Sequence, residues 1–112
     1  MSSDQNALNS DYSEAAPTFE QVSAMIGDII LEFGAPWCSH CQVAQPLVQE
    51  ELTEHPELVH IKLYDGKGKP LGRAFNVKLW PTLILLRDGK EIDRLIRPVR
   101  GDEIHHLLMQ SQ

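Results

Sequence analysis

The chain has 112 residues, 42% of them apolar and 23% charged, a composition typical of one soluble globular domain. Its two cysteines cannot build the disulfide framework of a small secreted domain, and no apolar run is long enough to span a membrane. The formal net charge of −6 argues against a nucleic-acid-binding protein, which would normally be basic. We therefore expect neither a membrane nor a nucleic-acid partner.

Charges are distributed unevenly along the chain. Residues 1–61 contain ten acidic residues and no Lys or Arg, whereas residues 62–112 contain ten Lys or Arg against six acidic residues. The asymmetry has two interpretations: a solvated surface that happens to be polarised, or a polar molecule that presents one charged end to a partner.

The first segment, residues 1–17, is polar and acidic and has no apolar stretch. We expect it to be disordered or loosely attached, and residues 18–112 to form the domain. The segment does not resemble a secretory signal, so we expect a cytoplasmic protein. In a reducing compartment, two cysteines three positions apart are more typical of catalysis or metal binding than of a structural disulfide.

The domain is predicted to begin with a short helix and a strand. Thr18 and Gln21 have the spacing of a capping box, and Gly27 is suited to end the helix they start. The apolar run at 29–33 is rich in β-branched residues, which predicts a strand buried on both faces. Glu32, inside this run, would then be a carboxylate in the core.

A second helix is predicted to begin at or just after Cys38 and to end before Pro56. We expect its inward face to consist of Val43, Ala44, Leu47, Val48 and Leu52. Pro46 lies inside this helix, where a kink is expected because the proline ring removes a backbone hydrogen bond.

The second half of the chain is predicted to form a strand at 58–64, an irregular helix at 68–77 and strands at 82–86 and 91–96. The Asp-Gly pair at 88–89 predicts a tight turn between the last two strands. Asp102 is expected to cap a final helix that turns Ile104, Leu107 and Leu108 inward. This order predicts an α/β fold with a mixed sheet of four to five strands and helices on both faces.

Two short motifs occur within this order of elements: LEFGAPWCSHC at 31–41 and WPT at 80–82. Together they resemble the thioredoxin fold and its Cys-x-x-Cys oxidoreductases over about residues 18–110. The features that agree jointly are Glu32, Trp37, Pro46, Pro81, Thr82 and Gly89. The resemblance implies a monomeric protein-disulfide oxidoreductase without a cofactor, whose redox-active disulfide is Cys38–Cys41.

The string around the cysteines is more similar to protein disulfide isomerase domains than to thioredoxin itself. Those domains carry Glu in place of Asp, Ala-Pro before the Trp, His before the second cysteine and an aromatic residue before the cis-proline. The corresponding residues here are Glu32, Ala35, Pro36, His40 and Trp80. We therefore expect a protein more oxidising than thioredoxin.

The spacing of the cysteines suggests their roles. Cys38 would be the nucleophile, because the N-terminus of a helix stabilises a thiolate. Cys41, one turn further, would resolve the mixed disulfide. His40 would stabilise the Cys38 thiolate, and Glu32 would take the proton of Cys41. Lys62 resembles the lysine partner that the family provides for this acid; a simple buried ion pair is the alternative.

We expect four residues to bind the client: Trp37, Trp80, Pro81 and Arg97. Pro81 resembles the family's cis-proline. Arg100 resembles an arginine of isomerase domains that tunes the second cysteine. The chain departs from thioredoxins at Gly34, where they have a Trp, and at Leu79, Trp80 and Arg97, where they have small residues. This altered surface predicts a preference for particular clients, and the nearby Lys78, Arg97 and Arg100 favour acidic ones.

The cysteine pair allows three other interpretations. A zinc site would need two more ligands from His40, His55, His60, His105 and His106, without a second cysteine pair, so we expect no metal. A disulfide that closes so short a loop would add little stability. The remaining alternative is a non-catalytic, thioredoxin-fold binding or chaperone-like module. For a catalyst, a thioredoxin reductase or glutathione is the expected recycling partner.

Overall fold

The computed structural model describes residues 16–65 and 69–111. Residues 1–15, most of the segment expected to be disordered, lie outside the described residues. The elements are α2 (Phe19–Ser23), β1 (Asp28–Gly34), α3 (Ser39–Thr53), β2 (Val59–Tyr64), α4 (Pro70–Ala74), β3 (Thr82–Arg87), β4 (Lys90–Ile96) and α5 (Gly101–Leu108). The predicted order of helices and strands is confirmed.

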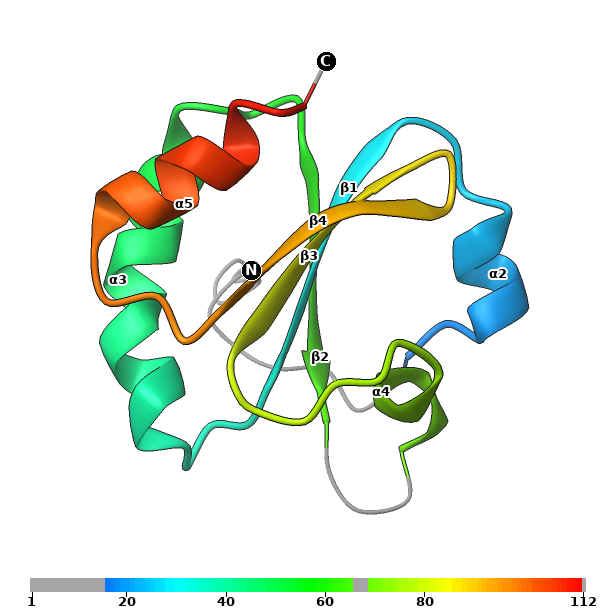
Figure 1. Cartoon of the computed structure of the whole chain (residues 1–112), viewed down its shortest axis with the longest axis horizontal. Coiled ribbons are helices and arrows are strands. Elements are labelled where there is room, and N and C mark those ends of the chain that lie inside the picture. The colour runs from blue at the N-terminus through cyan, green and yellow to red at the C-terminus, as the bar shows by residue number, and fades with distance from the viewer. Residues whose placement is uncertain (1–15, 66–68, 112) are drawn as a thin grey trace, which may run out of the picture.

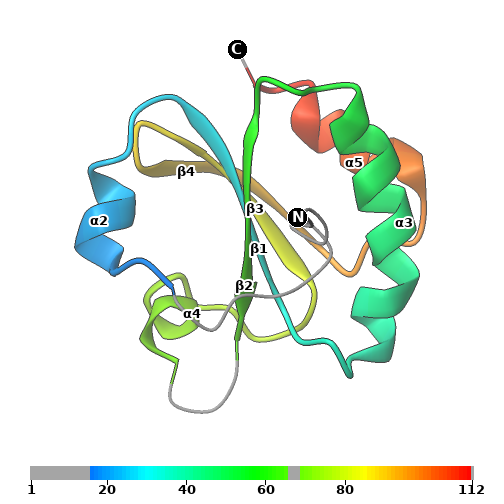
Figure 2. The same ribbon diagram turned by 180° about the vertical axis from the view of Figure 1, so that it is seen from behind.

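The four strands form one mixed sheet in the order β2-β1-β3-β4 (Figure 1). β1 runs parallel to β2 and antiparallel to β3, and β4 runs antiparallel to β3. α3 and α5 cover one face of the sheet, and α2 and α4 cover the other, as the two opposite views show (Figures 1 and 2). The predicted α/β fold is therefore confirmed, with four strands.

β1 supplies side chains to the apolar cores on both faces. Ile29, Leu31 and Phe33 pack in the core that includes residues of α2 and α4. Ile30 packs in the second core, with residues of α3 and α5. Because side chains alternate along a strand, Glu32 points to the same face as Ile30. The buried carboxylate predicted from the sequence thus lies on the α3 side of the sheet.

The predicted N-terminal cap is confirmed for the first helix, α2, but not for the last helix, α5. The capping box is present: the Gln21 N–H donates to Thr18 Oγ1 over 3.0 Å, and the Thr18 N–H donates to Gln21 Oε1 over 2.9 Å. Asp102, however, does not cap α5. Glu103 Oε1 accepts instead from the backbone N–H groups of Val99 and Arg100. Glu103 is the third residue of the helix, and its side chain reaches back to backbone N–H groups that precede the first turn. It therefore provides the cap that was expected from Asp102.

α3 agrees with the prediction except at one position. It contains Pro46 and begins directly after Cys38. Ala44 and Val48 are buried, but the side chain of Val43 is 57% exposed, so its assignment to the inward face is wrong. Successive residues are rotated by about 100° around a helix. Val43 is therefore rotated away from the buried face that Ala44 and Val48 define, and its side chain faces solvent.

None of the helices in the two described ranges, 16–65 and 69–111, is long and apolar enough to cross a membrane.

Candidate active site

The two predicted motifs meet at one end of the sheet, at the bottom of Figure 1. β1 and β2 end there, with Gly34 paired to Tyr64. β3 begins there with Thr82, which pairs with Ile96 at the end of β4. The loop that leads to Cys38, the segment before Thr82 and the segment after Ile96 therefore converge, although the sequence separates them widely.

The first cysteine occupies the N-cap position of α3. Cys38 has extended backbone angles, φ −80° and ψ 119°, and its thiol is half-buried. The Cys41 N–H points at Cys38 Sγ over 3.2 Å. Two bonds shape the loop: the Cys38 N–H donates to Ala35 O over 3.2 Å, and Gln42 Nε2 donates to Pro36 O over 2.9 Å. An anion at Cys38 Sγ would be stabilised by a backbone donor and by the helix dipole.

The second cysteine lies on the buried side of the same helix. Cys41 is 2% exposed, and Ala44, one turn later, packs in the same core as Ile30. Glu32 follows Ile30 on that face of β1 and is 1% exposed. Cys41 and Glu32 therefore share the interior between α3 and the sheet.

β2 places two basic side chains beside Glu32. Lys62 is the register partner of Glu32 and is 7% exposed. His60 Nε2 lies 2.7 Å from Glu32 Oε1, a contact that was not predicted. The alternation of 58–64 could have indicated it, because His60 and Lys62 lie two positions apart and thus on one face of the strand.

The loop before β3 holds the predicted proline. The Trp80–Pro81 peptide bond is cis, as the resemblance implied. Arg97 binds both residues of this bond: its backbone N–H donates to Pro81 O over 2.9 Å, and its Nε donates to Trp80 O over 2.8 Å. Arg97 itself has a positive φ of 53°. The end of β4 and the proline loop are thereby held together.

A carboxylate outside both motifs connects the two loops. Asp65 Oδ2 accepts from the indole N–H of Trp80 over 2.9 Å. The backbone N–H of Asp65 donates to Gly34 O over 2.9 Å. The preceding residue, Tyr64, contacts Trp37 edge to face, with ring centroids 5.3 Å apart. Asp65 was not identified from the sequence, where a single acid after a strand is an ordinary surface residue.

His40 and Arg100, the two residues predicted to tune the cysteines, make no hydrogen bond or ion pair with them in the described part of the chain. The ring of His40 is exposed and makes no hydrogen bond or ion pair within the described part of the chain. The Arg100 side chain is 68% exposed, and its Nε lies 2.9 Å from Asp102 Oδ1. That pair raises the pKa of Arg100 and lowers the pKa of Asp102. The guanidinium of Arg100 is thus directed to Asp102 rather than to Cys41.

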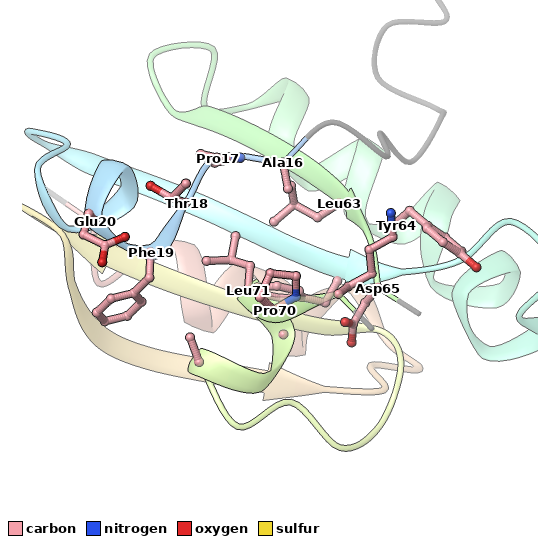
Figure 3. A pocket seen from close by; sticks show the side chains of 14 residues that line it. Ala16, Pro17, Thr18, Phe19, Glu20, Leu63, Tyr64, Asp65, Pro70 and Leu71 are labelled. Carbon is pink, nitrogen blue, oxygen red and sulfur yellow. The ribbon is translucent and has the colours of Figure 1, made fainter. Parts of the chain in front are cut away.

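A pocket of about 540 Å³ lies on the opposite face of the sheet from the cysteines, between α2, α4 and the ends of β1 and β2 (Figure 3). Leu63, Pro70 and Leu71 are among its apolar lining, and Tyr64 and Asp65 form its border with the site described above. Within residues 16–65 and 69–111, no group of three or more His, Cys, Asp or Glu side chains is placed to hold a metal ion.

A model of the thioredoxin family matches residues 11–110. The chain belongs to the thioredoxin family. The structure of thioredoxin 2 from Pseudomonas aeruginosa PAO1 in its reduced form is 43% identical, with a TM-score of 0.82, and the match covers 89% of this chain and 93% of that one. Thioredoxin from Chlamydia muridarum is 32% identical over 77% of this chain and 84% of its own length.

The chain spans only part of some thioredoxin-family relatives. The TPR repeat-containing thioredoxin TDX from Arabidopsis thaliana is 33% identical over 65% of this chain, but the match covers 19% of that protein. The family model and the similarity to thioredoxin 2 show that the fold and the Cys-x-x-Cys spacing are those of the thioredoxin family, whose general reaction is thiol–disulfide exchange.

Proposed function

We propose that this protein is a thiol–disulfide oxidoreductase that acts on protein disulfides through Cys38 and Cys41. The observation that supports it best is the pairing of a half-buried Cys38, at the N-terminus of α3, with a buried Cys41 one turn later. Only the first sulfur is accessible to a client, and the second is placed to follow it.

In the reducing direction, the Cys38 thiolate attacks a client disulfide. A bond forms between Cys38 Sγ and one client sulfur, and the other client sulfur leaves as a thiolate that takes a proton from water. Cys41 then gives its proton to Glu32 and attacks Cys38 Sγ, which forms the Cys38–Cys41 disulfide and releases the second client sulfur. The client gains two electrons and the cysteine pair loses two.

We further propose that the pair is more oxidising than thioredoxin. His40 lies in the first turn of α3, and a histidine there would favour the reduced, thiolate form of the pair. The reference potentials are roughly −270 mV for thioredoxin and about −180 mV for protein disulfide isomerase, and we expect a value between them. Equilibration with glutathione buffers measures it, and a value at or below that of thioredoxin would contradict the proposal.

The client surface combines apolar side chains with positive charge. Trp37 is 64% exposed, and Leu79 and Ile96 are each 46% exposed. Arg97 lies between the proline loop and the end of β4, and Lys78 precedes Leu79. We propose that the preferred clients carry acidic and apolar residues beside the disulfide. Equal rates on matched peptides flanked by Glu or by Lys would contradict this preference.

Insulin reduction with dithiothreitol tests the main proposal. We expect the wild type to accelerate precipitation of the insulin B chain, Cys38→Ser to abolish this effect, and Cys41→Ser to accumulate a mixed disulfide with the client. A non-catalytic binding module would instead hold the client without turnover, and Cys38→Ser would bind it equally well. Adding a thioredoxin reductase with NADPH, or glutathione, then identifies the recycling partner.

A further inference from the structure

The carboxylate assigned as the acceptor of the Cys41 proton has almost no direct contact with solvent. Glu32 is 1% exposed. A proton taken up there in each cycle must leave before the next one. His60 Nε2 contacts Glu32 Oε1 at 2.7 Å, and the His60 side chain is 16% exposed. From this geometry we propose that His60 carries the Glu32 proton to and from solvent, and so acts as a positioning residue for thiol–disulfide exchange.

The topology explains why His60 can reach both places. β2 is an edge strand and pairs only with β1 in the sheet. His60 lies opposite Ile30 in the parallel register, and Glu32 lies opposite Lys62. The His60 side chain is 16% exposed and its Nε2 lies 2.7 Å from the buried Glu32 Oε1, so the imidazole contacts both the carboxylate and solvent. A histidine suits this task because its two ring nitrogens can accept a proton at one side and release one at the other.

The other titratable groups near the pair come from two elements, β2 and α3. On β2, Lys62 faces the same side as His60 and is 7% exposed. On α3, Cys41 shares the interior, whereas Glu51, near the end of the helix, contacts His105 of α5 at 3.3 Å instead. On β3, the register partner of Glu32 is Leu83, which does not ionise. Within residues 16–65 and 69–111, His55 pairs with Glu57 and His105 with Glu51, so His60 is the histidine that contacts Glu32.

The inference rests on the proposed function, and its proton steps balance with that reaction. Cys41 gives its proton to Glu32 and becomes the thiolate that attacks Cys38. The protonated carboxyl passes the proton from Oε1 to His60 Nε2, and the imidazolium releases its other N–H proton to water at Nδ1. Tautomerisation restores the acceptor at Nε2. No electron passes through His60, because the two electrons move only between the cysteines and the client.

His60→Gln is the main test, because glutamine can still donate a hydrogen bond to Glu32 but cannot carry a proton. Resolution of a purified mixed disulfide at Cys38 should slow by about tenfold at neutral pH. This is less than the roughly 10²–10⁴-fold rate increase that a positioned acid–base group contributes, because Glu32 itself is retained. The acid limb of the pH–rate profile should move to higher pH, and the two proteins should converge in alkali. In a Glu32→Gln background, the same change should have no further effect.

Two further variants separate proton transfer from mere packing. His55→Gln is the matched control, since His55 is similarly shielded, 19% exposed, but contacts Glu57, whose side chain is 64% exposed; it should leave the profile unchanged. His60→Ala should be slow in buffer and should recover at least threefold when free imidazole is added, as expected when a missing acid–base group is replaced from solution. Without such rescue, and with a wild-type pH profile in His60→Gln, the inference is overturned.

A measurement that needs no turnover keeps this inference distinct from the proposed function. In the reduced protein, the ¹⁵N chemical shift of His60 Nε2 should change when Glu32→Gln is introduced, because the substitution replaces the carboxylate that the ring contacts at 2.7 Å. An unchanged His60 Nε2 signal overturns the relay. If the wild type fails in the insulin assay but this coupling is present, the proposed function is wrong and the coupled pair stands. If insulin is reduced but the coupling and rescue are absent, only the relay is wrong.

Discussion

The hydrogen bond between Asp65 and Trp80 offers a direct test of how the proline loop is held. Asp65 is 8% exposed, and its Oδ2 accepts the indole N–H over 2.9 Å. Asp65→Ala leaves that N–H without its partner. A hydrogen bond to a charged group is worth about 1.5–3 kcal/mol, and the partial exposure of Trp80 places this bond near the lower value. At about 4–8 °C per kcal/mol, Tm should fall by about 6–12 °C.

Asp65→Asn keeps an acceptor oxygen without the charge, so it should lose about half as much stability. Trp80→Phe removes the donor and keeps an aromatic ring. Urea unfolding followed by circular dichroism, on both single variants and on Asp65→Ala/Trp80→Phe, isolates the pair. We expect a coupling energy of about 1 kcal/mol. If the two single effects simply add, the bond does not hold the loop, and the reasoning is refuted.

The same substitution should affect protein clients more than small ones. Because Trp80 precedes Pro81 in the loop beside Cys38, displacing its side chain should change the backbone that a client contacts. Asp65→Ala should therefore raise KM for a protein disulfide severalfold, while the rate of reaction of Cys38 with a small disulfide reagent stays within about twofold. An equal loss on both substrates would place the effect at Cys38 rather than in the loop.

Three further predictions concern the turn, one exposed ion pair and the redox potential. Gly89 has φ +81°, and a Cβ there would overlap the backbone of the last residue of α2, whereas Gly27 has φ +89° and open space around it. Gly27→Ala should lower the free energy of unfolding by about 1 kcal/mol because of its backbone angle alone. Gly89→Ala adds a steric overlap, so it should lower the urea midpoint further. Because Arg100 lowers the pKa of Asp102, their pair stabilises the native state above the ordinary carboxyl range and loses this effect as pH falls through the lowered pKa. Both side chains are largely exposed, so Asp102→Asn should change Tm at neutral pH by less than about 2 °C, with no difference in strong acid. His40→Pro should lower the redox potential; an unchanged value in a glutathione titration would exclude the proposed tuning.

The fold was largely predictable because its signals are local and agree with one another. The apolar run at 29–33 favoured a strand buried on both faces, and the Asp-Gly pair at 88–89 favoured a tight turn between two strands; both are present. The errors arose where two local signals compete. Asp102 has the right chemistry for a helix cap, but Glu103 reaches the free N–H groups instead. Val43 is apolar yet lies at the exposed edge of its helix face.

The site was predictable only where residues lie in one motif. Cys38 and Cys41 are fixed relative to each other by one helical turn, which the sequence displays directly. The contact of His60 with Glu32 depends instead on the register between β1 and β2, and that of Asp65 with Trp80 on where β2 ends. Register and strand ends are tertiary properties, set by the packing of the whole sheet.

Arg97 holds the proline loop in a way that bears on the proposed client surface. It has a positive φ of 53°, and a non-glycine side chain in this region costs about 1–2 kcal/mol. Its backbone N–H binds Pro81 O, and its Nε binds Trp80 O, two hydrogen bonds that offset this cost. The second bond has a consequence for binding. A client that uses Trp80 O must compete with the guanidinium, whereas an acidic client gains a charged partner in the same place. We therefore propose that Arg97, the residue that stabilises the loop, also discriminates between clients.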